Sequence, residues 1–176
     1  MYELENSMSS LRSAALVGAK FIEFDIHHTQ DGEPILMHDK KLKRTAKSID
    51  GRECEIRKKI SDLTLSDIER NCQLNNGEDI PRLSEVLLEF ANSDIHFFIE
   101  LKDTPSVATL NLIYRFYRDR PDQVTIISFE KEVLDILEED TRMIELLEGG
   151  MKLYHLAVFN MCAKKSYDGV GLRMPS

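Results

Sequence analysis

The sequence predicts an α/β fold built around a parallel β-sheet, and three observations support this prediction. Apolar runs that alternate in the manner of strands are separated by segments whose apolar residues recur at helical spacing. Residues 124–127 form an apolar run of the kind found in strands that are buried on both faces of a parallel sheet. No internal repeat, low-complexity tract or linker divides the chain, so a single domain over residues 1–176 is expected.

Helices are predicted where apolar residues recur every three or four positions. Residues 7–17 carry Met8, Leu11 and Ala15 on one side, and Asn6 or Ser7 can cap the start of this helix. A polar, charged stretch of weak periodicity predicts a loop-rich insertion at about residues 46–82, with one short helix near residues 66–72. Three more helices are expected over residues 84–91, with Ser84 as the candidate N-cap, residues 105–119 and residues 130–138.

Strands are predicted where side chains alternate between two faces. In residues 21–27 one face carries Ile22, Phe24 and Ile26, which suits packing against helices. The opposite face, with its two carboxylates, then points to the interior of a sheet or barrel. An Asp31-Gly32 turn leads into a second strand over residues 34–37. Further strands are expected over residues 95–101, 124–127, 143–147 and 168–172, whereas residues 151–162 are ambiguous between helix and strand.

Carboxylates on the interior face are the most informative feature of these strands. Glu23 and Asp25 share that face of the first strand, and Glu100 repeats the pattern near the end of the strand over residues 95–101. Unpaired interior carboxylates are costly, and a hard cation such as Mg²⁺ or Ca²⁺ would relieve that cost by taking their oxygens as ligands. Ion pairing with nearby Lys or Arg side chains is the alternative. His38, at a strand end, is suited to proton transfer beside such a site.

Composition argues against some classes of function and indicates the cellular compartment in which the protein is expected. A net charge of −8 argues against general nucleic-acid binding, which needs Lys and Arg to neutralise phosphates. Cys54, Cys72 and Cys162 are few, odd in number and widely spaced, so three reduced thiols are expected. No apolar run approaches the length of a membrane span and no charged-then-apolar leader opens the chain. We therefore expect a cytoplasmic protein without a transmembrane segment.

The most distinctive stretch of the chain runs from Ile22 to Thr45 and reads IEFDIHHTQDGEPILMHDKKLKRT. This string resembles the glycerophosphodiester phosphodiesterase family, whose pattern reads E-x-D, T-x-D-G, H-D and L-x-R-T. Further segments fit the family in the same order, namely Glu5-Asn6, residues 80–83, residues 98–102 and residues 124–129. The resemblance implies a TIM-barrel enzyme that uses a divalent metal to hydrolyse a small-molecule glycerophosphodiester.

The resemblance also implies a role for particular residues. Glu23, Asp25 and Glu100 match the acidic positions that hold Mg²⁺ or Ca²⁺ in the family. His38 matches the second histidine of the family's acid–base pair and would protonate the leaving alkoxide, with Asp39 orienting its ring. Two further residues are expected to contact substrate: Lys102, which follows the third acidic position, and His27, which lies on the interior face.

Two features of the family pattern are absent from the 176 residues: a His-Arg-Gly tripeptide upstream of the Glu-Asn pair, and a segment that contains Trp. We therefore expect an incomplete TIM barrel without its first and last strands, and a lowered activity because the tripeptide would supply a general base and a phosphate-binding arginine. Two alternatives stay open. One is a non-catalytic relative that binds metal and a phosphorylated ligand; the other is an incomplete gene product that self-associates through open sheet edges.

Overall fold

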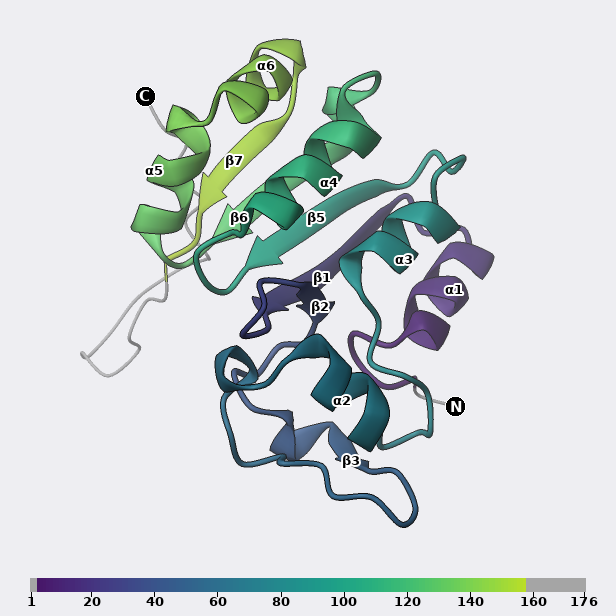
Figure 1. The fold of residues 1–176 in the computed structure, drawn as a ribbon. Coiled ribbons are helices and arrows are strands. Elements are labelled where there is room, and N and C mark those ends of the chain that lie inside the picture. The colour runs from purple at the N-terminus through teal and green to yellow at the C-terminus, as the bar shows by residue number, and fades with distance from the viewer. Residues whose placement is uncertain (1–2, 158–176) are drawn as a thin grey trace, which may run out of the picture.

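The computed structural model describes residues 3–157, which are arranged around an open five-stranded sheet (Figure 1). The strand order is β2-β1-β5-β6-β7, and all neighbours are parallel except β2, which runs antiparallel to β1. The predicted parallel sheet is confirmed, and it does not close within the described residues, as expected of an incomplete barrel. The strands are β1 (Phe21–His28), β2 (Pro34–Leu36), β5 (His96–Leu101), β6 (Val124–Ser128) and β7 (Lys152–His155).

Helices cover the face of the sheet to which the first strand turns its Ile and Phe side chains. In Figure 1, α3 and α4 lie across the strands, α1 lies beside α3, and α5 and α6 lie beside β7. The helices around the sheet are α1 (Met8–Leu16), α3 (Leu83–Glu89), α4 (Val107–Tyr117), α5 (Lys131–Glu139) and α6 (Thr141–Gly149). Short 3-10 turns also occur within residues 3–157: η1 (Leu42–Arg44), η2 (Ile60–Asp62) and η3 (Pro121–Gln123).

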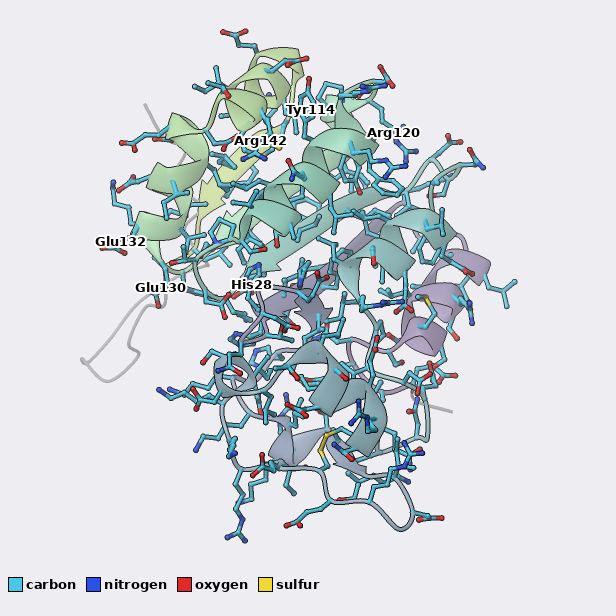
Figure 2. The ribbon with its side chains drawn as sticks, viewed as in Figure 1. His28, Tyr114, Arg120, Glu130, Glu132 and Arg142 are labelled. Atoms are coloured by element: carbon cyan, nitrogen blue, oxygen red, sulfur yellow. A yellow bond between two sulfur atoms is a disulfide. The ribbon has the colours of Figure 1, made fainter. Side chains whose placement is uncertain are left out.

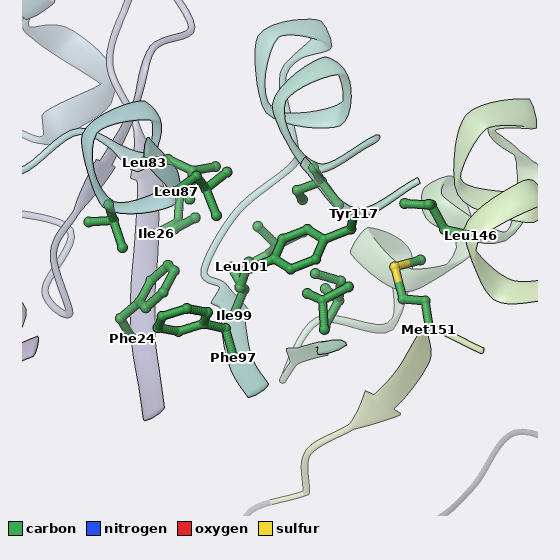
Figure 3. Close-up of a cluster of buried hydrophobic side chains, with 14 of the residues drawn as sticks. Phe24, Ile26, Leu83, Leu87, Phe97, Ile99, Leu101, Tyr117, Leu146 and Met151 are labelled. Atoms are coloured by element: carbon green, nitrogen blue, oxygen red, sulfur yellow. The ribbon is translucent and has the colours of Figure 1, made fainter. Parts of the chain in front are cut away.

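The main core fills the space between the sheet and these helices (Figure 3). Ile22, Phe24 and Ile26 are all buried there, which confirms the helix-facing side predicted for β1. The Phe24 and Phe97 rings lie 5.5 Å apart between centroids, in a tilted arrangement that aromatic pairs favour. All five residues of β6 are buried, as the apolar run predicted. This packing fixes the orientation of the strands and hence of their opposite, carboxylate-bearing face.

A smaller lobe is formed by the segment predicted to be a loop-rich insertion. It contains a two-stranded antiparallel sheet of β3 (Ala46–Ser48) and β4 (Cys72–Leu74) together with α2 (Leu65–Asn71). In Figure 1 this lobe lies below the main sheet. It has an apolar core of its own, to which Ile60, Ile68 and Leu74 contribute. The segment is therefore more regular than its weak periodicity indicated.

A disulfide bond joins Cys54 and Cys72 within this lobe, so the expectation of three reduced thiols is wrong (Figure 2). Backbone pairing explains how two residues 18 positions apart meet. Ser48 is the ladder partner of Cys72, and the Ser48 hydroxyl accepts a hydrogen bond from the backbone N–H of Cys54 at 3.0 Å. Ser48 thus holds both cysteines beside itself. A spacing of this length carries no motif in the sequence, and only the strand register brings the pair together.

Removal of this disulfide is expected to lower the free energy of unfolding by about 3 kcal/mol, because a cross-link that closes a loop of this length restricts the unfolded chain by about that amount. The variant Cys54→Ala/Cys72→Ala, followed by urea unfolding, measures the loss. The parent unfolded in the presence of a thiol reductant should show the same loss of stability as this variant. Alkylation of the unfolded, unreduced parent should leave Cys54 and Cys72 unlabelled, and labelling of both would contradict the pairing.

Four other predictions about the elements are corrected, resolved or lie outside the described residues. Residues 143–147 were expected to form a strand but lie in α6, because the Asp140 carboxylate caps the helix by accepting from the N–H groups of Arg142 and Met143. Helix α3 begins after Arg82, not at Ser84. The ambiguity over residues 151–162 resolves to strand β7 in its first part. The strand expected over residues 168–172 lies outside the described residues.

Candidate functional site

Three carboxylates converge on the face of the sheet opposite the main helices. The strand register pairs Asp25 of β1 with Glu100 of β5, and Glu23 lies two residues earlier on the same side of β1. One oxygen from each of the three residues lies within 4.8 Å of the others. The sequence predicted this set, and the parallel pairing of β1 with β5 is what assembles it from segments 75 positions apart, as the register Asp25↔Glu100 shows.

Lys102 lies directly against two of these acids. Its Nζ is 2.8 Å from Asp25 Oδ1 and 2.5 Å from Glu100 Oε1, so the ion-pairing alternative applies to these two carboxylates. Burial lowers the pKa of Lys102, but the hydrogen bonds and charges of Asp25 and Glu100 outweigh burial and raise the pKa above its usual value. Burial also raises the pKa of Glu100 despite its bond to Lys102. One ammonium therefore serves two acids and leaves negative charge uncompensated.

The pKa of Glu23 shows the effect of that uncompensated charge. Part of its side chain reaches solvent, yet the surrounding protein desolvates the carboxylate and, with the charges of Asp25 and Glu100, raises the pKa of Glu23 to about 7. The charges of Lys102 and His38 act in the opposite direction but do not cancel this shift. A carboxylate that resists ionisation at neutral pH indicates a shortage of positive charge. Three hard oxygen donors with too little positive charge fit a divalent cation such as Mg²⁺ or Ca²⁺.

Asn6 orients Asp25 from the loop that precedes α1. Its Nδ2 donates to Asp25 Oδ2 at 2.8 Å, and its Oδ1 accepts from the Asp25 backbone N–H at 3.0 Å. The residue has a φ of 54°, a left-handed conformation that Asn tolerates better than most residues. The sequence offered Asn6 or Ser7 as the cap of α1, and Ser7 is the residue that caps it. Asn6 also belongs to the Glu5-Asn6 segment that fits the family pattern, but its contact with Asp25 was not predicted.

His38 follows β2 and lies near enough to Glu23 for its charge to act on that carboxylate. Its ring is exposed, and its Nδ1 is 2.9 Å from Asp39 Oδ1. Arg44 donates to both oxygens of Asp39 at 2.8 and 2.9 Å and also binds Glu5. These contacts, with Arg44 the larger contributor, hold the pKa of Asp39 well below its usual range. Asp39 therefore stays ionised and fixes one nitrogen of the His38 ring, which leaves the other nitrogen available.

His27 belongs to a polar network that the sequence did not predict. Asp103 binds two histidines at once: its Oδ2 is 2.7 Å from His27 Nδ1, and its Oδ1 contacts His28 Nδ1. His28 in turn lies 2.7 Å from the Thr109 hydroxyl of α4 and is buried (Figure 2). Burial raises the pKa of Asp103, but the hydrogen bonds from His27 and His28 prevail and lower it to about 2. Asp103 thus fixes His27 beside the carboxylates.

The lowered pKa of Asp103 predicts an acid-sensitive contribution to stability. Because the folded-state pKa lies below the ordinary 3.8, the contribution is present above pH 3.8 and is lost as the pH falls towards about 2. We expect it to be about 1 kcal/mol, since partial exposure of Asp103 screens the interaction. Urea unfolding at several pH values should show that the free energy of unfolding of Asp103→Asn falls less steeply below pH 3.8 than that of the parent. Asp119→Asn, at an exposed surface acid, should leave the profile unchanged; equal profiles for both variants would contradict the network.

The comparisons with known proteins agree on one family. The model of the glycerophosphoryl diester phosphodiesterase family matches residues 1–150. Human glycerophosphodiester phosphodiesterase 1 is 32% identical over 148 residues, which cover 78% of this chain and 42% of that protein. The glycerophosphodiester phosphodiesterase of Bacillus subtilis is 31% identical over 173 residues, covering 84% of this chain and 56% of the relative. The chain thus spans about half the length of the curated relatives that it matches.

A solved structure supports the same assignment at the level of the fold. The crystal structure of glycerophosphodiester phosphodiesterase from Agrobacterium tumefaciens matches with a TM-score of 0.63 at 23% identity, over 76% of this chain and 56% of that one. The position of the acidic triad on the sheet agrees with the motif that carried the resemblance in the sequence. With residues 1–150 matched, the chain belongs to the glycerophosphoryl diester phosphodiesterase family.

Proposed function

We propose that this chain carries the catalytic site for metal-dependent hydrolysis of glycerophosphodiesters to glycerol 3-phosphate and an alcohol. The observation that carries the proposal is the convergence of Glu23, Asp25 and Glu100 from two strands, with His38 near enough for its charge to act on Glu23. Two relatives named glycerophosphodiester phosphodiesterases match most of this chain. The phosphodiesterase activity that their names state is attributed to this chain only as part of the proposal.

The three carboxylates would hold Mg²⁺ or Ca²⁺, because hard cations prefer carboxylate oxygens. When bound, the cation would offset the negative charge that develops on the phosphodiester as it is attacked. Asn6 keeps Asp25 in place through its two hydrogen bonds. Such a supporting contact matters because ligand orientation governs the affinity of metal sites.

His38 would donate a proton to the leaving alkoxide, which is a poor leaving group unless it is protonated. Ionised Asp39 accepts from one ring nitrogen, and Arg44 keeps Asp39 in position. Lys102 and His27 border the carboxylates and would contact the substrate phosphate. The residue that activates water is not assigned in this proposal. The His-Arg-Gly that the family pattern places before the Glu-Asn pair is not among the 176 residues.

Turnover of glycerophosphocholine and glycerophosphoethanolamine in the presence of Mg²⁺ or Ca²⁺ tests the proposal. We expect release of glycerol 3-phosphate above the level of a Glu23→Ala control. His38→Ala should lower the rate by about a hundredfold or more, because loss of a positioned acid has that effect. A rate equal to the Glu23→Ala background would remove catalysis from the proposal for this chain.

A non-catalytic relative that binds metal and phosphate is the second candidate, since Glu23, Asp25 and Glu100 could hold a cation whether or not a base activates water. Calorimetry separates the two candidates. Cation binding without turnover supports the second one, whereas an absence of binding supports the incomplete gene product. Self-association through the open edges stays a prediction; within residues 3–157, β2 and β7 are the outer strands of the main sheet.

The compartment needs a separate proposal. No helix in the described part of the chain has the length and apolar character needed to cross a membrane. The cytoplasmic location stays a prediction, and the bonded pair Cys54 and Cys72 removes one of its supports. Disulfides persist mainly in oxidising compartments, so the cysteine pair favours such a compartment. Comparison of the redox state of Cys54 and Cys72 in freshly lysed cells, with thiols trapped by alkylation, distinguishes the two locations.

A further inference from the structure

A cationic cavity adjoins the carboxylates on the side of the small lobe. It has a volume of about 470 Å³, and its charged and titratable lining consists of Lys40, Lys59, Lys102, His27, His28 and Asp103. Lys102 joins the two regions, since the same side chain lines the cavity and binds Asp25 and Glu100. The cavity and the proposed catalytic centre therefore share Lys102 as a common boundary.

Backbone contacts fix Lys40 and Lys59 on the same wall although they are far apart in the sequence. Lys41 and Lys59 form an antiparallel bridge, and the Ile60 N–H donates to the Lys40 carbonyl at 3.0 Å. Ile60 itself is buried in the core of the small lobe, which anchors this contact. Both lysines are exposed, and neither makes an ion pair with any residue in the range 3–157. Two ammonium groups thus face the cavity without an anionic partner.

The charge of this region is opposite to that of the whole chain, which has a net charge of −8. The only carboxylate that lines the cavity is Asp103, and both of its oxygens are engaged by His27 and His28. A neighbouring cavity of about 640 Å³ shares Lys40 and adds Lys41 and Lys43; its one carboxylate, Asp39, is paired with Arg44, which also lines it. The wall next to the catalytic centre therefore favours an anion that lies beyond the scissile phosphate.

We propose that the preferred substrates are glycerophosphodiesters whose alcohol carries a second phosphate, held by Lys40 and Lys59 while the diester lies at the carboxylates. This inference rests on the proposed function and names its substrate class. A phosphate monoester suits the site because lysine ammonium groups form short, charge-assisted hydrogen bonds with its oxygens. A head group without a second anion would leave Lys40 and Lys59 hydrated, so the two lysines would not increase its affinity.

A matched pair of ligands tests the proposal: glycerophosphoglycerol, and the same compound with a phosphate monoester on its terminal hydroxyl. Calorimetry with Ca²⁺ present should show that the phosphorylated compound binds at least about tenfold more tightly. Lys40→Ala/Lys59→Ala should abolish this preference and leave the affinity for glycerophosphoglycerol unchanged. Lys20→Ala/Lys152→Ala, which removes the same charge at the opposite ends of the strands, should retain the preference. The preference should also weaken as salt is added.

The outcomes separate this inference from the proposed function. Equal binding of the two ligands would overturn the inference and leave the proposed function intact. Lysine-dependent binding of the phosphorylated compound without turnover of either ligand would support the inference and count against catalysis. A last arm uses vesicles of phosphatidylcholine with and without a phosphorylated lipid. If the lysines are needed for vesicle binding and the soluble ligands bind equally, the wall docks a membrane surface and the inference is wrong.

Discussion

Glu100→Gln is expected to weaken Ca²⁺ binding by at least about a hundredfold and to reduce glycerophosphodiester turnover to background. The substitution keeps the shape of the side chain but removes one of the three charged ligands, and hard cations bind neutral amides in such sites far less strongly than carboxylates. Its ion pair with Lys102 is also lost, so Lys102 would bind Asp25 alone and compete with the cation for that ligand. Both changes act in the same direction.

The measurements are calorimetric titration with Ca²⁺ and assay of glycerol 3-phosphate release. Glu132→Gln is the matched control, because it makes the same change at an exposed site on α5 (Figure 2). Circular dichroism establishes that each variant is folded. Unchanged heats for Glu100→Gln in a folded protein would refute the cation site, and loss of binding in Glu132→Gln as well would show that overall charge is responsible.

Phe24→Ala is expected to lower the free energy of unfolding by about 3–5 kcal/mol, the usual cost of deleting a buried aromatic side chain. Phe24 is 1% exposed and packs between β1 and the helices, where its ring meets that of Phe97 (Figure 3). The cavity left behind could not close easily, since Phe97 also contacts Phe90 of the segment after α3. This loss is large against a typical total stability of about 5–15 kcal/mol.

Thermal unfolding followed by circular dichroism measures this effect, with a decrease of roughly 10 °C in the midpoint expected for a chain of this size. Leu88→Ala provides the control on α3, because Leu88 is 70% exposed and its removal should cost less than about 0.5 kcal/mol. A shift for Phe24→Ala as small as that of the control would contradict the described core.

The main sheet and the acidic triad could be predicted from the sequence because both depend on the alternation of apolar and acidic side chains along single strands. The pattern of β1 alone predicted which side faces the helices, and the pattern around Glu100 predicted the same for β5. Parallel pairing then places Asp25 beside Glu100 without any further specification. Motif spacing added His38 as a candidate, and in the structure it follows β2 and its charge acts on Glu23.

Features that depend on contacts between distant segments could not be predicted in this way. The pairing of Cys54 with Cys72 arises from the register of β3 on β4, which no local pattern specifies. Asp103 binds two adjacent histidines 75 residues earlier in the chain, so its role exists only in the fold. Residues 143–147 lie in α6 and not in the predicted strand, because the Asp140 carboxylate caps the helix that contains them.

The ion pairs of Lys102 with Asp25 and Glu100 affect how folding of this chain depends on ion binding. The Lys102 ammonium acts as an internal counter-ion that lets Asp25 and Glu100 approach each other in the folded state. We therefore expect the chain to stay folded when divalent cations are chelated, unlike small domains that unfold without their ion. Under the proposed function, a bound cation would replace the Lys102 ammonium at these carboxylates, so its affinity would depend on the exchange of one positive charge for another, and the displaced ammonium would lie near the anionic substrate.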